Sequence, residues 1–600
     1  MSDTAPHSPE SGLSSSVVPT RGWEEVDKAV GRVEGTGPRP SVRKFDEASW
    51  CCDWDLASLV DTEEASVAAP ADRRDQVQQV KELDELFRVI YPLIRQYELE
   101  HASPSEHKVV EYLSSQDLAA VVNLQLPDEG SSTDFIQGCQ DALRYSVRTA
   151  HPRFMNQLFA GSEPCGQVAE LLTSVINNSV HTYGAAPLAT VVEQHLIEHV
   201  GQLAGFSAAD GIFCPGGSYA NMGAMLVARN ELFPHVSDKG WQAGDRPVVF
   251  TSAQAHYSVK KAAMMLGIGT SHCMLVSTDC HGRMRPDHLE SLIVTAKRQG
   301  QTPFFVSCTS GTTVTGSFDP LRAVVEICRR HGVWVHADGA WGGAVIFSDK
   351  HRNLVEGLGG CDSFCFNPHK LLGVSSQCTL LLLNQQTAGH GCCRPGALQR
   401  SNDTLADYLF HSASQHDSDD LGHKSLQCGR KPDCLKLWLH WKRHGTLGLA
   451  RRVNRAFTYA QRLAHLVAQD PRFRLILHPE SCNVCFYYIP PSVRHLLPPP
   501  ITDFSPSIED VPADDGHFGG PGVSLPGTVK RLSSIFETLD TATQTIYRRM
   551  QVKGSLLVNY SPLPDHGLPS FFRPVIIQPK VQDEDLLFML DEIDRIGCDL

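Results

Sequence analysis

The sequence predicts an α/β protein built on a mainly parallel central sheet, with a smaller α+β domain toward the C-terminus. Between residues 210 and 385, short β-branched or aromatic runs alternate with helical segments, which is typical of parallel strands joined by crossover helices. The expected strands are RPVVFTS, CMLVS, PFFVSCT, VWVHAD, SFCFN and CTLLLL. Beyond residue 430, the helical run CLKLWLHWKRHG, the strand NVCFYYIP and the closing helix DEDLLFMLDEIDRIG indicate the smaller domain.

The rest of the chain divides around this core. Residues 1–80 mix Ser, Pro, Gly and charge without periodicity and are expected to form a mobile tail. Apolar residues at helical spacing in LDELFRVIYPLIRQYELE, QVAELLTSVINNSV and VVEQHLIEHVGQLAGF predict amphipathic helices that face a core. We therefore expect a helical segment at 81–150, a large α/β domain at 151–425 and a small domain at 426–600. A Pro-, Gly- and Asp-rich stretch at 491–527 is expected to be a flexible insertion.

Composition and charge exclude several classes of protein. The 600 residues are 42% hydrophobic and 20% charged, as in a globular protein with a sizeable core. The net charge of -14 argues against a nucleic-acid partner, because such partners demand a basic face. The chain has no apolar run of membrane-spanning length and no signal peptide, so we expect a cytoplasmic protein with no membrane partner. The 19 cysteines form an odd, scattered set and are expected to be reduced thiols.

Cys482 and Cys485 form a CxxC pair, a spacing that also occurs in metal and redox sites. They lie in the apolar, strand-like run CNVCFYYIP, where residues three apart point to opposite faces. We therefore favour the interpretation that both are separate core residues.

Two segments, VWVHADGAWGG and SFCFNPHKLLG, carry the strongest chemical signal. Asp338 ends one buried strand and Lys370 follows the next, at about the 30-residue length of one β-α-β step. Both side chains are expected at the carboxyl edge of one sheet, where open α/β folds bind ligands. A buried lysine with a lowered pKa can form a Schiff base with an aldehyde, and a carboxylate can hold a pyridine nitrogen protonated. Either residue alone would be weak evidence, since a strand-end Asp is commonly a cap and a loop lysine is usually solvated.

With both motifs present, the sequence resembles the group II pyridoxal-phosphate (PLP) dependent decarboxylases. Their Asn-Pro-His-Lys and His-x-Asp-x-Ala-Trp motifs stand here at residues 367–370 and 336–341. The likeness covers residues 100–600 and points to the glutamate, cysteine-sulfinate and aspartate decarboxylase branch. The ordered motifs that carry it are HPRFMNQLFAG, GIFCPGG, FTSAQAHYSVKKA, SGTTVTGSFDP, ADYLF, LQCGRKPDCLKLWLHWK and SFFR. The resemblance implies PLP as cofactor, the aspartate-aminotransferase-like fold type I, and a homodimer with active sites at the subunit interface.

The resemblance also implies roles at the coenzyme. Lys370 would carry PLP covalently, and Asp338 would pair with the pyridine nitrogen so that the ring accepts electrons. His256, in QAHYS, matches the histidine that stacks on the ring. Further coenzyme-binding candidates are Ala340, His369 and Thr312.

The segment CPGGSYANM is the expected phosphate site. Gly217 and Ser218 precede a helical pattern, and glycines there let backbone N–H groups and a helix N-terminus approach a phosphate. Ala220 stands where the resembled enzymes usually have a phosphate-binding serine. One hydroxyl contact is therefore expected to be lost, with Ser218 or backbone amides in its place.

Tyr408, in ADYLF, matches the tyrosine of a mobile lid. In the resembled family this residue comes from the neighbouring subunit and protonates the α-carbon after CO₂ has left. The residues that follow it, HSASQHDSDDLG, depart from the family's usual lid sequence, which leaves the order of the lid and the rate open.

The resemblance places the substrate among five residues. Arg573, in SFFR, matches the arginine that clamps the α-carboxylate, and Gln157 is expected to help hold the same group. Phe159 and Ser179 match the cysteine-sulfinate type, and a bulky residue at 159 shortens the pocket and so disfavours glutamate. His181 matches neither branch, and if protonated it would pair with the distal carboxylate.

We therefore expect decarboxylation of aspartate to β-alanine or of cysteine sulfinate to hypotaurine, with glutamate as the third substrate. Two alternatives stay open. One is an aminotransferase on the same fold, which would use the same lysine and aspartate. The other is a non-catalytic interaction scaffold, whose contact sites would be the N-terminal tail and the 491–527 insertion.

Overall fold

The computed structural model describes residues 74–385, 393–404, 406, 408–410, 419–496 and 526–600. The chain divides into two compact units, residues 1–84 and 85–600. The first unit contributes only the start of helix α2 (Arg74–Glu100) to the described residues, so the helix expected from residue 81 begins earlier. The rest of the expected tail, and most of the insertion expected at 491–527, lie outside the described residues.

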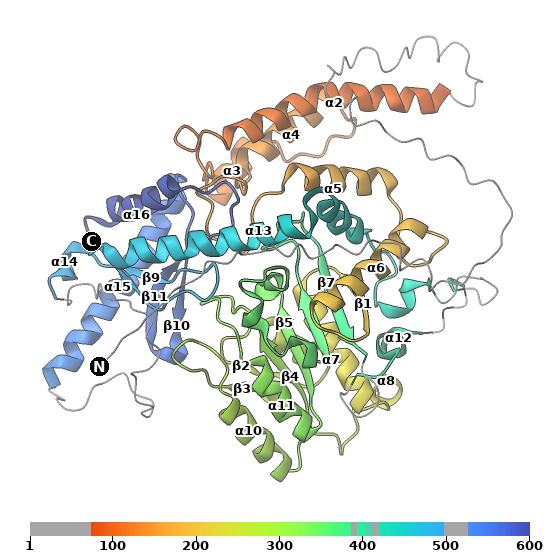
Figure 1. Cartoon of the computed structure of the whole chain (residues 1–600). Helices are drawn as coiled ribbons and strands as arrows, with labels where there is room; N and C mark the ends of the chain where they lie inside the picture. Colours follow the sequence, from red (N-terminus) through yellow and green to blue (C-terminus); the bar gives the residue numbers. More distant parts are fainter. Residues whose placement is uncertain (1–73, 386–392, 405, 407, 411–418, 497–525) are drawn as a thin grey trace, which may run out of the picture. The chain divides into compact units, whose positions relative to one another are not determined.

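A seven-stranded sheet forms the centre of the second unit (Figure 1). Its order is β1-β7-β6-β5-β4-β2-β3, in which β7 is antiparallel to both of its neighbours and the other pairs are parallel. The strands are β1 (Ala209–Cys214), β2 (Pro247–Ser252), β3 (Cys273–Val276), β4 (Thr302–Thr309), β5 (Trp334–Gly339), β6 (Ser363–Phe366) and β7 (Thr379–Asn384). The predicted fold class and all six expected strands are confirmed, and β1 is an additional strand.

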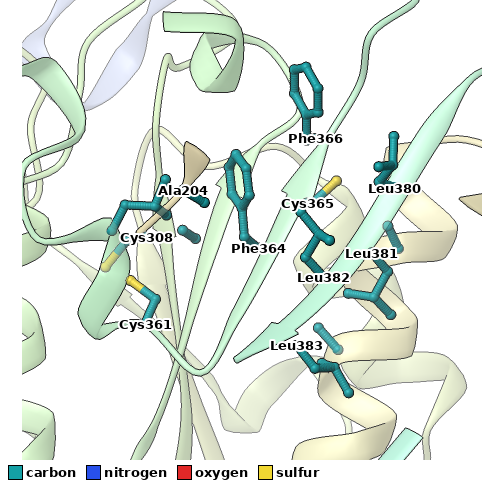
Figure 2. Close-up of a cluster of buried hydrophobic side chains, with 14 of the residues drawn as sticks. Ala204, Cys308, Cys361, Phe364, Cys365, Phe366, Leu380, Leu381, Leu382 and Leu383 are labelled. Atoms are coloured by element: carbon teal, nitrogen blue, oxygen red, sulfur yellow. The ribbon is translucent and has the colours of Figure 1, made fainter. Parts of the chain in front are cut away.

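Both faces of this sheet are covered. Strands β2, β5, β6 and β7 are buried at every position, as expected for strands of a mainly parallel sheet between layers of helices. Helix α7 (Gly217–Leu232) packs along β4 to β7, while α10 (Pro286–Arg298) and α11 (Leu321–His331) pack against β4 and each other. Figure 2 shows Phe364 and Phe366 extending from β6 in this core, with their rings stacked at 6.0 Å between centroids.

The connection from β5 to β6 differs from the α-helical crossover that the spacing predicts. It consists of three 3-10 helices, η6 (Gly342–Phe347), η7 (Arg352–Val355) and η8 (Leu358–Gly360). All six residues of η6 are buried. A Cβ at Gly342 would lie 2.7 Å from the Phe318 ring, and one at Gly343 would lie 2.8 Å from the Phe364 ring. The segment therefore lies too close to the sheet for the side chains of an ordinary helix.

A four-stranded antiparallel sheet of order β10-β11-β9-β8 forms the smaller domain. Its strands are β8 (Phe473–Leu475), β9 (Phe486–Tyr488), β10 (Asn559–Leu563) and β11 (Leu568–Arg573), with helices α15 (Pro526–Lys553) and α16 (Asp583–Gly597). Helix α13 (Asp433–Gln469) belongs to both domains (Figure 1). Its residues up to Phe457 join the core of the large sheet, and those from Ala460 join the core of the small one. The domain limits given above remain predictions.

Helix α5 (Pro164–Ile176), one of the helices expected to face a core, leaves most of its apolar face exposed in this chain. It buries only the small residues Gly166, Ala169 and Thr173. Its large apolar side chains are exposed, by 42% to 70%: Val168, Leu171, Leu172, Val175 and Ile176. Periodicity identifies an apolar face, and in this helix a single chain does not cover it.

The remaining helices complete the described structure. They are α3 (Ser115–Val121), α4 (Ser132–Tyr145), α6 (Pro187–Leu203), α8 (Val236–Lys239), α9 (Ser258–Met265), α12 (Ala397–Asn402), α14 (Pro491–Arg494), η5 (Thr270–His272), η10 (Leu421–Lys424) and η11 (Pro564–His566). Among all helices of the described ranges, none has the length and hydropathy needed to cross a membrane. Every cysteine in these ranges is a free thiol, as predicted. Cys482 packs in the core of the large sheet and Cys485 in a separate cluster, which confirms that they point apart.

Candidate active site

A cavity of about 230 Å³ lies at the carboxyl ends of the parallel strands of the large sheet. Predicted site residues that line it are Gly217, Ser218, His256, Asp338, Ala340, His369 and Lys370. The other lining residues are Asn221, Tyr257, Thr309, Gly311, Thr313, Trp341 and Asn367. The strand edge therefore gathers the expected coenzyme residues from positions far apart in the chain.

Lys370 lies in a tight turn directly after β6. Its backbone N–H donates to the Asn367 carbonyl at 3.1 Å, and the carbonyl of the next residue, Leu371, accepts from Arg452 Nε at 2.9 Å. Burial lowers the pKa of the Lys370 amine, and the nearby Asp338 carboxylate opposes this shift. A buried amine of lowered pKa is the nucleophile that an aldehyde coenzyme requires.

Asp338 is the penultimate residue of β5, the strand next to β6, and is 4% exposed. Its Oδ1 accepts the backbone N–H of Ala340 at 3.1 Å, and its Oδ2 accepts Asn221 Nδ2 at 2.7 Å. Two donors on opposite oxygens fix the plane of the carboxylate, so it is presented to the cavity in one orientation.

A series of buried hydrogen bonds supports the Asp338 carboxylate through Asn221. Trp334 Nε1 donates to Ser363 Oγ at 2.8 Å, and Ser363 Oγ lies 2.8 Å from His336 Nδ1. His336 Nε2 in turn lies 3.0 Å from Asn221 Oδ1. Burial lowers the pKa of His336 to about 4, so the ring is neutral and carries one proton. Every atom is satisfied only when Ser363 donates to Nδ1 and Nε2 donates to Asn221, which leaves the amide hydrogens of Asn221 for Asp338.

The same asparagine also orients His256. Asn221 Nδ2 donates to Ser258 Oγ at 2.9 Å, and Ser258 Oγ lies 2.9 Å from His256 Nδ1. The backbone N–H of Ser258 donates to that nitrogen as well, at 3.3 Å, so Nδ1 is an acceptor and the proton of the neutral ring is on Nε2. Burial lowers the pKa of His256, with opposite contributions from Asp338 and Lys370. A neutral, oriented imidazole is suited to lie flat against an aromatic ring.

The N-terminus of α7 forms one wall of the cavity. The helix begins at Gly217, and its N-cap, Gly216, has φ +101° and no capping side chain. The first N–H groups of the helix therefore lack a side-chain acceptor and favour an anion. A Cβ at Gly217 would lie 3.1 Å from Asn367 Nδ2 and 3.2 Å from the Ala340 Cβ, a tight fit that favours glycine at this position. This wall fits a phosphate, with Ser218 beside it.

His369 and Thr312, both predicted coenzyme residues, differ in their relation to the cavity, and Ala220 stands where a contact was expected to be lost. His369 lines the cavity, its Nδ1 donates to the Cys378 carbonyl at 2.7 Å, and burial lowers its pKa to about 4. Ala220 is fully buried within α7 and does not line the cavity, so the lost serine hydroxyl has no counterpart there. Thr312 is also absent from the lining, because its hydroxyl bonds to Thr315 Oγ1 at 2.7 Å within its own turn.

The small domain places a buried cation against the cavity wall, although Arg573 is not itself a lining residue. Arg573, on β11, is 5% exposed, and its Nη1 donates to the carbonyl of the lining residue Thr313 at 2.9 Å. Asn483 Nδ2 donates to the same carbonyl at 3.0 Å, and Asn483 Oδ1 accepts Trp341 Nε1 at 2.9 Å. Burial lowers the pKa of Arg573. The asparagine of the CxxC segment thus holds two lining residues, Thr313 and Trp341, in place.

The structure does not bring the other predicted substrate residues to this cavity. Phe159 is 40% exposed and lines a different cavity, of about 530 Å³, with Ser375 and Ser376. Ser179 Oγ donates to the Cys428 carbonyl at 3.2 Å, and His181 Nδ1 is buried without a hydrogen-bond partner. Tyr408 is 84% exposed. Gln157 likewise is not a lining residue.

The sequence interpretation did not identify the residues whose hydrogen bonds orient Asp338. Asn221 stands in the quoted CPGGSYANM, four residues after Gly217, so helical spacing places both on one face of α7. Ser363 lies opposite His336 on the neighbouring strand. Only the first of these relations could have been read along the chain.

The mainly parallel sheet, the buried lysine opposite an aspartate and the uncapped helix N-terminus define a PLP enzyme of fold type I. Residues 116–489 match the pyridoxal-dependent decarboxylase conserved domain, and the chain therefore belongs to this family. Its cofactor is pyridoxal phosphate, and it is a PLP-dependent amino acid carboxy-lyase. When bound, the coenzyme supplies a ring that accepts the electron pair left by the departing CO₂.

The relatives agree with this assignment. Over 501 residues the chain is 40% identical to the acidic amino acid decarboxylase GADL1 of Bos taurus, covering 83% of this chain and 88% of that protein. Over 520 residues it is 37% identical to the human cysteine sulfinic acid decarboxylase, covering 86% and 97%. The crystal structure of mouse CSAD superimposes with a TM-score of 0.77 at 34% identity, covering 86% and 99%.

Proposed function

We propose that this enzyme removes the α-carboxylate of a small acidic L-amino acid, either aspartate to give β-alanine or cysteine sulfinate to give hypotaurine. Glutamate is the third substrate in order of preference. The names of the relatives, an acidic amino acid decarboxylase and a cysteine sulfinic acid decarboxylase, support an acidic substrate.

The observation that carries the proposal is the state of Arg573. Its guanidinium is buried and bonds to a neutral carbonyl, and no carboxylate of the described ranges lies within ion-pair distance of it. A buried cation without an anion is costly, because desolvation is not compensated. A substrate carboxylate would compensate that cost and would be held by the planar fork of the guanidinium.

The other residues take roles that follow from their positions. Lys370 holds the coenzyme covalently, Asp338 keeps its ring nitrogen protonated, and His256 lies against the ring. Each is supported by its place in the cavity and by the hydrogen bonds that fix it. Thr312 remains a proposed coenzyme residue that acts through the turn carrying Thr313.

Gln157, Phe159, Ser179 and His181 form the proposed pocket for substrate side chain and carboxylate. Support comes from the cavity at Phe159, which also contains Ser375 and Ser376, residues that closely follow the Lys370 turn. A large ring at position 159 limits the length of the substrate.

We further propose a homodimer in which Tyr408 of one copy donates a proton at the α-carbon of a substrate held by the other. The exposed apolar row on α5 supports a second copy as its cover, and Tyr408 is exposed on its own chain. Val175→Glu should give monomers of low activity in analytical ultracentrifugation, whereas Leu447→Glu, at a residue exposed to a similar degree, should stay dimeric. A dimeric Val175→Glu protein would exclude this interface.

Substrate preference is tested with the purified, PLP-loaded enzyme. We expect kcat/KM for aspartate or cysteine sulfinate to exceed that for glutamate. Phe159→Ser should raise the value for glutamate relative to aspartate by about 10-fold or more, because it lengthens the pocket. A wild-type preference for glutamate would overturn the proposed order.

We also propose a cytoplasmic location, supported by the many buried free thiols of the described residues, which are typical of reducing compartments. Fractionation of cells that express the native chain should recover it in the cytosol. Recovery in a membrane or organelle fraction would contradict the proposal.

A further inference from the structure

Four side chains with metal-binding atoms converge away from the active-site cavity, where α5 begins beside α13. Glu163 is the N-cap of α5 and Cys165 lies in its first turn. His440 and His444 are one turn apart on α13, a spacing that places both on one helix face. One ligand atom from each residue lies within 4.8 Å of all the others.

The separations between the ligand atoms are close to those of a tetrahedral metal centre. Zinc bonds of about 2.0 to 2.3 Å place the ligand atoms of a tetrahedron roughly 3.3 to 3.8 Å apart. Cys165 Sγ lies 3.4 Å from His440 Nδ1 and 3.4 Å from His444 Nε2. His444 Nε2 lies 3.0 Å from Glu163 Oε2. Small side-chain adjustments would therefore bring all four atoms to bonding distance of one ion.

The chemistry of the four residues also fits a ligand set. A neutral imidazole offers a lone pair, and a metal ion displaces the proton of a thiol that it binds. One thiolate and one carboxylate would balance the charge of a divalent ion.

The surroundings hold the ligands in place. Arg452 pairs with Oε1 of Glu163, which leaves Oε2 toward the histidines. Arg452 also binds the carbonyl of Leu371, the residue after Lys370, so the cluster is joined to the catalytic turn. A cavity of about 210 Å³ borders Glu163, His440 and His444 and provides a path for an ion.

We propose that Glu163, Cys165, His440 and His444 bind a divalent transition-metal ion, with zinc preferred, and that this ion fastens α5 to α13 beside the turn that carries Lys370. Sulfur, nitrogen and oxygen ligands in a tetrahedron are the set that zinc prefers among abundant ions. Four protein ligands close the coordination shell, so the site is structural. Its presence does not depend on which amino acid the enzyme decarboxylates.

The test is metal content and spectroscopy of the full-length, PLP-loaded enzyme without an affinity tag. We expect about one zinc per chain by mass spectrometry of the metal. After exchange for Co²⁺, we expect the d–d bands of tetrahedral cobalt with a thiolate ligand, read at wavelengths beyond the coenzyme absorption. Zinc should also raise the melting temperature of the wild type.

Cys165→Ser and His444→Gln should each weaken metal binding by about 10- to 100-fold or more, since even changes outside the ligand shell cost that much. His444 is 32% exposed, so its variant should fold. Cys280→Ser, at an exposed cysteine outside the cluster, is the matched control and should bind metal as the wild type does. Absence of bound zinc and of the cobalt bands in the wild type, or wild-type metal affinity in both ligand variants, would overturn the proposal.

Discussion

Replacing Asn221 with alanine tests whether the hydrogen bonds behind Asp338 control the coenzyme site. Asn221 is 2% exposed, and its side chain contacts Asp338, Ser258 and His336. Asn221→Ala would leave Asp338 with one backbone donor and His336 Nε2 without an acceptor. The aspartate would then be free to turn, while the lysine of the site would be untouched.

The expected size of the effect follows from the bonds lost. A hydrogen bond to a charged group contributes about 1.5 to 3 kcal/mol, which corresponds to roughly 10- to 150-fold in an equilibrium constant. We expect PLP affinity to fall by about this factor. The unsatisfied His336 nitrogen should lower the free energy of unfolding by about a further 1 to 3 kcal/mol.

The assay is titration of the apoenzyme with PLP, followed by absorbance, with urea unfolding measured on the same preparations. Asn230→Ala is the matched control, because Asn230 lies on the same helix and bonds instead to the Ser401 carbonyl at 3.5 Å. The control should bind PLP as the wild type does. Wild-type affinity in Asn221→Ala would refute the role given to this chain of hydrogen bonds.

Three further predictions concern other parts of the site. Tyr408→Phe should still release CO₂ but should protonate the coenzyme carbon more often, because the phenol proton is gone. Mass spectrometry of the aldehyde product measures this misprotonation. An unchanged ratio of aldehyde to amine product would exclude Tyr408 as the proton donor. Arg573→Lys should raise KM by about 10- to 100-fold through loss of two-point carboxylate recognition, and an unchanged KM would remove Arg573 from the substrate site. His336 has a folded pKa depressed to about 4, so its contribution to stability is present above its unfolded pKa and is lost as pH falls toward 4. In His336→Gln, the loss of unfolding free energy at acid pH, measured by urea unfolding, should therefore be smaller by up to about 3 kcal/mol. The control His495→Gln, at an exposed histidine, should keep the wild-type dependence. An unchanged pH profile in His336→Gln would contradict the pKa assignment.

Six of the seven strands of the large sheet could be predicted because each is a short, largely apolar run between turn residues. The connection before β6 could not, since its 3-10 helices depend on the contact of Gly342 and Gly343 with aromatic rings from other segments. The exposure of the apolar face of α5 could not be predicted from the hydrophobic periodicity either. Periodicity identifies the apolar face of a helix but carries no information on whether the same chain or another covers it.

The central pair of the site could be predicted because the carboxyl ends of neighbouring parallel strands meet at one edge, which brings Asp338 and Lys370 together. The bonds through Asn221 and His336 join a helix to two strands, so they depend on three-dimensional alignment. The metal cluster shows the same limit. Cys165 and His440 are 275 residues apart, and no spacing rule relates them.

The most direct test of the account is to find where the coenzyme is attached. The PLP-loaded enzyme would be reduced with borohydride, which makes the linkage permanent, and then digested and mapped by mass spectrometry. The account predicts a pyridoxyl group on the peptide that contains Lys370, and its absence in Lys370→Ala. A modified lysine elsewhere in the chain, or an unmodified digest, would contradict it.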